Sequence, residues 1–208
     1  MSASLAQTLL AADLAGLQAL LSADPALAPA RANEIIAWGP HGKNRSHPLH
    51  YVCDLRFEGH ITAAASLPLV EALLAAGADV DFPHVQHGDT PLIAAASLAC
   101  EDIGLRLLAA GANPAATGLF GATALHWASL LGMPGLVQAL VAAGAPLNLP
   151  DQQYGSTPLG WAQHGLASPP NGNQGGQAEV IAILQEAATF ADELHARARR
   201  GILANEWE

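Results

Sequence analysis

Residues 121–145 read GATALHWASLLGMPGLVQALVAAGA, and this stretch decides the fold. Thr123 can cap a helix, because its side chain can accept a hydrogen bond from a backbone N–H of the first turn. Further along, apolar residues recur at helical spacing from Leu136 to Val141, and Gly144 follows where a helix commonly ends in a left-handed residue. The stretch therefore predicts two short antiparallel helices, neither of which can bury its apolar face alone.

Both halves of this stretch recur along the chain at a nearly constant distance. The capping threonines are 33 and 34 residues apart: Thr90, Thr123 and Thr157. The glycines that end the second phrase are 34 and 33 residues apart: Gly77, Gly111 and Gly144. Units of this kind bury their apolar faces by stacking on their neighbours, so the repeats predict one continuous core.

The openings of the units also match one another in part. They are His47–Val52, Thr90–Ala95, Thr123–Ala128 and Thr157–Ala162. These openings and the repeat length resemble the ankyrin repeat family, whose opening is Thr-Pro-Leu-His-x-Ala. The resemblance implies an all-α ankyrin-repeat solenoid of stacked helix-turn-helix units. Three residues depart from the family pattern, because His47 replaces the threonine while Ile93 and Gly160 replace the histidine.

We expect a single ankyrin repeat domain over residues 1–208, with about five repeats. Helices at 5–11 and 16–23 lack the opening phrase, as expected of an end repeat with a solvent-facing side. The expected limits are 1–30 for this N-terminal repeat, 31–82 for the second, 83–115 for the third, 116–149 for the fourth, 150–190 for the fifth and 191–208 for a C-terminal helix or tail.

Three segments are longer than the two central repeats require. Insertions in repeat arrays often lie on the binding face, so the segments 38–47, 56–66 and 166–177 are candidate walls of a small-molecule pocket. The alternative is drift in tolerant loops, because the entropy of loop closure grows slowly with length. The polar segment 38–54 likewise has two interpretations, a ligand-orienting site or an overlong hairpin that joins the first two repeats.

The composition excludes several classes of partner. The chain has 8 Lys plus Arg against 18 Asp plus Glu, and its formal net charge of −10 disfavours nucleic acid. No apolar run approaches the roughly 18 residues of a membrane span, and the N-terminus has no basic leading segment, so we expect no membrane binding and a cytoplasmic location. Two cysteines, Cys53 and Cys100, exclude a disulfide framework and indicate reduced thiols.

Nine histidines raise the question of a metal site. His47 and His50 lie three residues apart, and on one helical turn both can face an ion shared with His41 or His87. However, His50 and His126 occupy the histidine position of the opening, which in the ankyrin family packs within the stack and makes structural hydrogen bonds. The chain also lacks Cys-x-x-Cys pairs and His-Glu-x-x-His spacing. We therefore expect no metal and no cofactor.

A catalytic role finds little support in the pattern. Asp54 with His87, or Tyr154 with His164, supplies an acid and a base, but neither pair has a spacing that is diagnostic of an active site. The question of enzymatic activity stays open, with a non-enzymatic role favoured.

The aromatic residues Tyr51, Trp127 and Trp161 occupy equivalent places in three units. They either line a ligand groove or pack between neighbouring repeats. We favour packing, because an aromatic side chain just after the opening contributes a large buried area.

The leading hypothesis is a binding module that recognises a protein or peptide through its concave groove and hairpin tips. The alternative is a small-molecule-binding protein or an enzyme. The resemblance places the recognition surface at the hairpin tips and first helices, with Phe120, Leu130 and Leu131 as apolar anchors. The candidate binding residues are Lys43, Asn44, Arg45, His47, Asp54, His87, Asp89, Phe120, Leu130, Leu131, Tyr154 and His164.

Overall fold

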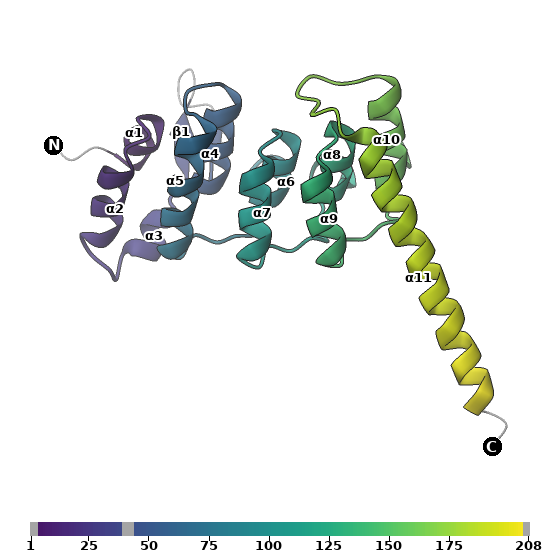
Figure 1. Ribbon diagram of the computed structural model, residues 1–208. Helices are drawn as coiled ribbons and strands as arrows, with labels where there is room; N and C mark the ends of the chain where they lie inside the picture. Colours follow the sequence, from purple (N-terminus) through teal and green to yellow (C-terminus); the bar gives the residue numbers. More distant parts are fainter. Residues whose placement is uncertain (1–3, 39–43, 206–208) are drawn as a thin grey trace.

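A computed structural model describes residues 4–38 and 44–205. Over these residues the chain forms the all-α solenoid that the repeats predict, with one short β-hairpin near its N-terminal end. Figure 1 shows helix pairs that follow one another along a single direction. Within the same residues, no helix combines the length and the apolar character needed to cross a membrane.

The first helix pair is α1 (Leu5–Leu10) and α2 (Leu14–Ser22), followed by the short helix α3 (Ala28–Ala32). The second pair is α4 (Pro48–Phe57) and α5 (Ala63–Ala75), and the third is α6 (Pro91–Ser97) and α7 (Glu101–Ala109). The fourth pair is α8 (Ala124–Leu131) and α9 (Pro134–Ala142), and the fifth is α10 (Pro158–Ala167) and α11 (Gln177–Asn205).

The helices lie in two rows. In the inner row α4, α6, α8 and α10 pack on one another, and in the outer row α5, α7, α9 and α11 do the same. α11 has 29 residues, and in Figure 1 it extends well beyond the stack. One apolar core runs through the pairs, from Leu5 and Leu9 in α1 to Val180 and Leu184 in α11. Each fully buried leucine contributes roughly 1.5–3 kcal/mol relative to an exposed one.

The helix ends follow the predicted capping pattern. The Thr90 and Thr157 hydroxyls accept backbone N–H bonds of the first turn, and Thr123 forms a capping box with His126. The glycines that follow α5, α7 and α9 adopt left-handed φ values of 88°, 93° and 83°: Gly77, Gly111 and Gly144. A side chain would strain the backbone at such angles, which explains why glycine recurs there.

The segment 56–66 is not the inserted loop that the spacing predicts. α4 and α5 have 10 and 13 residues, whereas α6 and α7 have 7 and 9. The additional residues therefore lengthen two helices and leave only residues 58–62 between them. The Thr62 hydroxyl accepts a hydrogen bond from Ala65 N at 3.3 Å and so caps the N-terminus of α5.

The segment 166–177 does contain a loop, and this loop covers the C-terminal end of α8. Gln174 N donates to Leu131 O at 2.7 Å, and Gly176 N donates to Gly132 O at 3.2 Å. These bonds satisfy carbonyl groups that the end of a helix leaves without partners. Leu131 is only 4% exposed. Our prediction of Leu131 as an exposed apolar anchor is therefore wrong.

The hairpin consists of β1 (Ile36–Trp38) and β2 (Asn44–Ser46), which pair antiparallel. Trp38 Nε1 donates to Ser46 Oγ at 2.9 Å, and Ser46 Oγ donates to Asp54 Oδ2 at 3.1 Å. The Trp38 ring also packs on Tyr51, with 5.5 Å between the ring centroids. These contacts, together with packing against α1 and α4, support the interpretation of the described part of 38–54 as a hairpin joining two repeats.

Candidate interaction site

Three loops join the helix pairs beside the inner row, and we call them the fingers: residues 79–90, 113–123 and 146–157. Backbone N–H groups bond each finger to the next one: Asn113 N to Asp81 Oδ1 (2.9 Å), Leu119 N to Asp89 Oδ1 (2.8 Å) and Gln152 N to Phe120 O (2.7 Å). The fingers are therefore held in register with the helices that carry them.

Two histidines of the inner helices also bond to the fingers and help to hold them in place. His50 Nε2 bonds to Asp89 O at 2.8 Å, and His126 Nε2 bonds to Ser156 O at 3.2 Å. Because a carbonyl only accepts, both rings carry their proton on Nε2. Burial lowers the pKa of His126 and lowers the pKa of His50 to about 3. The predicted structural role of this histidine position is confirmed.

A cavity of about 580 Å³ lies between α8 and α10, under the last two fingers. Four of the predicted binding residues line it, although they come from four different parts of the chain: Phe120, Leu130, Tyr154 and His164. The remaining walls are Trp127, Ser156, Gly160 and Trp161. The cavity is thus lined by four aromatic rings of Phe, Tyr and Trp, and its volume is in the range of ordinary ligand pockets.

Phe120 is held at the cavity by a strained backbone. It lies in the short 3-10 turn η2 (Leu119–Gly121) with φ 63° and ψ 12°. A residue with a Cβ costs roughly 1–2 kcal/mol in this left-handed region, where glycine would be free of strain. The bonds to Asp89 and Gln152 hold the finger on both sides and maintain this conformation. Such strain often accompanies a functional position.

Asp151 organises the other side of the cavity. Its carboxylate accepts hydrogen bonds from Gln153 N (2.8 Å), Tyr154 N (2.6 Å), Ser156 N (3.0 Å) and Trp161 Nε1 (2.9 Å). Desolvation raises the pKa of Asp151, but these four donors outweigh it and hold the pKa at about 2. Asp151 is therefore ionised at neutral pH and fixes the backbone of Tyr154 and the ring of Trp161.

The two tryptophans form the inner part of the lining. Their rings are nearly perpendicular at 86°, with 5.0 Å between centroids. Trp161 is 6% exposed and also packs edge-on against His126 at 5.3 Å. Trp127 Nε1 is buried and has no hydrogen-bond partner among residues 4–38 and 44–205. Trp127 and Trp161 thus pack between repeats, as favoured from the sequence, and line the cavity as well.

The comparisons with known proteins agree with this architecture. Residues 59–151 match a family model that describes ankyrin repeats in three copies. The chain contains an ankyrin repeat domain. No curated protein matches the chain in sequence. Ankyrin repeats are generally protein–protein interaction modules, so a protein is the class of partner that the family indicates. Phe120, Trp127 and Leu130 lie inside the matched ankyrin region, while Tyr154 and His164 follow it.

At the N-terminal end of the ankyrin stack, His47 is a predicted binding residue that is bonded within the fold and does not line a cavity described here. His47 is 1% exposed, caps α4 by accepting from Leu49 N at 3.4 Å, and bonds to Asn33 Oδ1 at 2.9 Å. Burial lowers the pKa of His47 to about 4. Our prediction of His47 as a binding residue is therefore wrong, because the ring is enclosed by the repeats that it joins.

Asp54 is also engaged within the fold. Its carboxylate is half-buried and accepts the Ser46 hydroxyl. Burial raises its pKa to about 6, because desolvation outweighs the effect of that hydrogen bond. Asp89 is half-buried and positions Leu119. Among the predicted polar contacts here, Asn44, Arg45 and His87 are exposed, and Lys43 lies outside the described residues.

The histidines of this end form a row of aromatic contacts. Ring centroids are 6.0 Å apart for His47 and His50, 5.5 Å for His50 and His84, and 5.1 Å for His84 and His87. Over the described part of the chain, no group of three or more His, Cys, Asp or Glu residues is placed to hold a metal ion. Desolvation lowers the pKa values of His50 and His84, as expected of neutral packed rings.

None of the cavities described here is lined by described residues of all three long segments. Arg56 and Gln174 share a depression of about 510 Å³, but none of the described residues of 38–47 lines it. The acidic groups in this depression serve the fold, since Asp102 pairs with Arg56 and Glu101 accepts from Leu136 N at 2.8 Å. The cavities of the described residues thus do not support a pocket built from all three segments, and residues 39–43 of the first segment lie outside the described residues.

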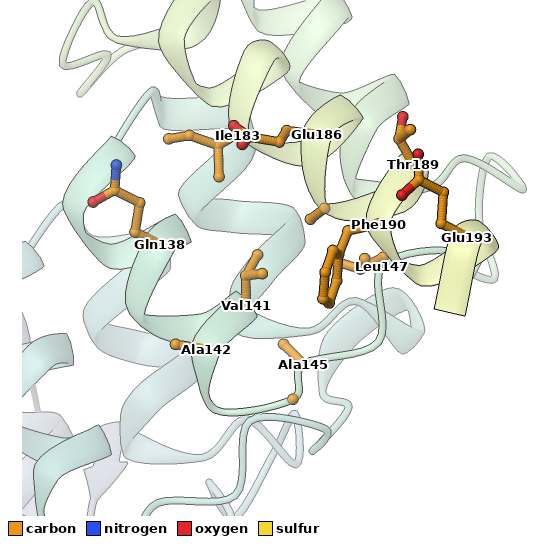
Figure 2. A pocket seen from close by; sticks show the side chains of 12 residues that line it. Gln138, Val141, Ala142, Ala145, Leu147, Ile183, Glu186, Thr189, Phe190 and Glu193 are labelled. Atoms are coloured by element: carbon orange, nitrogen blue, oxygen red, sulfur yellow. The ribbon is translucent and has the colours of Figure 1, made fainter. Parts of the chain in front are cut away.

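A larger depression of about 880 Å³ lies in the outer row between α9 and α11. Figure 2 shows Val141 and Phe190 pointing into it, with Glu186 and Glu193 on the α11 side. Phe190 is 67% exposed. This outer groove contains none of the predicted binding residues, and it provides a matched control surface for the cavity of the inner row.

Sequence reasoning missed Gly160 as a wall of the cavity. The signal was present, because Gly160 replaces the histidine of the repeat opening and so removes a ring from α10. The sequence favoured packing for the tryptophans and did not predict that the same rings also line a cavity.

Proposed function

We propose that the protein binds a segment of another protein in the cavity between α8 and α10, and we call this cavity the aromatic pocket. The observation that supports the proposal is the convergence of Phe120, Leu130, Tyr154 and His164 on one cavity. Its aromatic lining resembles the composition of interaction hot spots, which are rich in Trp and Tyr.

The pocket is accessible and rigid at the same time. Phe120 is 40% exposed and Tyr154 is 71% exposed, so both rings have surface left to bury against a partner. Their backbones are fixed by Gln152 and Asp151, respectively. A preformed surface loses little conformational entropy on binding, which favours recognition by these two rings.

The experiment compares partner capture by three forms of the protein that carry the same affinity tag. The first is the wild type, the second carries Phe120→Ala with Tyr154→Ala, and the third carries Phe190→Ala in the outer groove. We expect specific partners of the wild type to bind the double variant at least about tenfold more weakly, because truncation of hot-spot aromatics typically costs more than 1 kcal/mol each.

The Phe190→Ala form should retain full binding, since its ring is exposed to a similar extent as that of Tyr154 but lies in the outer row. Thermal melting of all three forms checks that the fold is unchanged. Equal capture by the wild type and the double variant would overturn the proposal, as would an equal loss in the Phe190→Ala control.

A further inference from the structure

We propose that the aromatic pocket is a cation site, which takes an ammonium or guanidinium side chain from a basic segment of the partner. This inference rests on the proposed function and specifies the chemistry of the residue that enters the pocket. It follows from the kind of rings in the lining, from the charge behind them and from the charge of the chain.

The lining offers more aromatic surface than one apolar side chain requires. Phe120, Trp127, Tyr154 and Trp161 all line one cavity, and the two indole rings meet at 86°. In this T-shaped contact the edge of one indole packs on the face of the other. The ring faces that remain in the lining can attract a cation through their quadrupoles. Tryptophan is the strongest partner for a cation, and two tryptophans are present.

The charge next to this lining is negative. The carboxylate of Asp151 is ionised, is 3% exposed and accepts a hydrogen bond from Trp161 Nε1 at 2.9 Å. An indole that donates to a carboxylate is polarised so that its ring becomes richer in electrons, which strengthens its attraction for a cation. Asp151 thus acts from behind the wall on Trp161, which is 6% exposed, while Phe120 and Tyr154 supply the more exposed rings.

The described lining of the pocket contains one basic side chain, the imidazole of His164. None of the described residues that line it is Lys or Arg. The whole chain carries 8 basic against 18 acidic residues, with a formal net charge of −10. Long-range attraction therefore favours a basic segment, and the pocket provides a desolvated place for one of its charges.

The first test uses two probes of nearly the same shape. Choline carries a quaternary ammonium, and 3,3-dimethylbutan-1-ol has the same branched outline with carbon in place of nitrogen and no charge. Titration into full-length, isotopically labelled protein follows the side-chain signals of Trp127 and Trp161. We expect choline to bind at least about fivefold more tightly than the neutral alcohol, as cation–π contacts predict.

Matched variants then separate ring electrostatics from simple apolar contact. Phe120→Leu and Tyr154→Leu keep apolar bulk without a ring face, so each should weaken choline binding at least about threefold and leave the neutral alcohol unchanged. Tyr154→Phe keeps the ring and should restore choline binding to the wild-type level. Phe190→Leu in the outer groove is the control and should change neither titration.

The second test uses pentapeptides with lysine, arginine or norleucine at the centre. Norleucine keeps the aliphatic stem of lysine but lacks its charge, so the cation site predicts that only the charged peptides shift the two tryptophan signals. The proposal is overturned if choline and the alcohol bind equally, if neither binds, or if Phe120→Leu leaves choline binding unchanged.

These outcomes separate the cation site from the proposed function. Partner capture that depends on Phe120 and Tyr154, without any preference for choline or lysine, would retain the aromatic pocket as an interaction site for an apolar side chain and reject the cation site. Choline binding without any Phe120-dependent partner capture would reject the proposed protein partner, and it would direct attention to a small cationic ligand.

Discussion

The two ends of the inner row use similar residues for different purposes. Around α4, the rings of Trp38 and Tyr51 pack together at a tilted angle, and His47 and Asp54 form hydrogen bonds with neighbouring polar groups. Around α10, Trp127 and Trp161 also pack together, but they line an open cavity with Phe120 and Tyr154. The comparison teaches that a cluster of polar and aromatic residues indicates function only where neighbouring repeats leave it accessible.

The cause of the difference lies in what covers each inner helix. The hairpin of β1 and β2 packs against α4, and its Ser46 hydroxyl donates a hydrogen bond to Asp54. The corresponding finger over α8 is turned by the left-handed Phe120 and leaves a cavity beside the ring. Polar groups at the first end therefore join neighbouring repeats, while the rings of Phe120 and Tyr154 at the second end stay exposed.

Asn33→Ala is expected to have the largest effect on stability. Asn33 Oδ1 accepts from Asp79 N at 2.7 Å and bonds to His47 Nε2 at 2.9 Å, while Nδ2 donates to Pro29 O and Gly77 O. Loss of this network between the first two repeats should lower the unfolding free energy by about 3 kcal/mol. Urea unfolding measures the loss. A change below about 1 kcal/mol would contradict the structural role given to the N-terminal end.

Acid is expected to weaken the N-terminal end. Burial lowers the pKa of His47 to about 4 and of His50 to about 3, against 6.5 in the unfolded chain. Below pH 6.5 the unfolded chain therefore binds more protons, and stability falls as the pH decreases toward the folded values. From pH 7 to pH 5 each histidine removes roughly 2 kcal/mol. Urea unfolding at both pH values, with hydrogen exchange of α4 and α10, measures the size and place of the loss.

Protonation of Asp54 has the opposite effect on the free energy of unfolding, so this residue provides a control for the acid-induced loss of stability. Its pKa is raised to about 6 by burial, against 3.8 in the unfolded chain, so the folded chain gains a proton first as the pH falls below 6. Asp54→Asn removes this gain and should increase the acid loss between pH 7 and pH 5 by about 1 kcal/mol. Stability that rises on acidification in the wild type would show that the buried histidines are protonated in the fold.

One substitution at two positions isolates the hydrogen bond to Asp151. Trp161→Phe removes the donor at 2.9 Å, whereas Trp127→Phe removes an N–H that has no partner in the described residues. Both changes lose a similar ring area, so Trp161→Phe should cost about 1.5–2 kcal/mol more than Trp127→Phe. Thermal and urea unfolding of the two variants measure this difference. Equal losses would mean that the hydrogen bond from Trp161 to Asp151 does not contribute to the stability of the fold.

Sequence periodicity predicts the solenoid well, because the cap and glycine positions report local backbone chemistry. Thr90 and Gly111 adopt the predicted conformations. Candidate site residues are predicted less well, since burial of Leu131 and His47 depends on contacts with distant segments. Gln174 reaches Leu131 across 43 positions of sequence, and no local pattern encodes that contact. Phe120 and Tyr154 were predictable because a finger tip has few neighbours to cover it.

Phe120→Gly is expected to have the smallest effect on stability and a large effect on binding. Glycine adopts φ 63° without strain, and this relief offsets the lost contacts of a ring that is 40% exposed. The unfolding free energy should change by no more than about 1 kcal/mol, whereas binding to a partner should weaken at least about tenfold. Urea unfolding and partner titration on the same sample measure both quantities. A loss of stability comparable to that of Asn33→Ala would show that Phe120 serves the fold, and the contrast between the two ends of the inner row would then disappear.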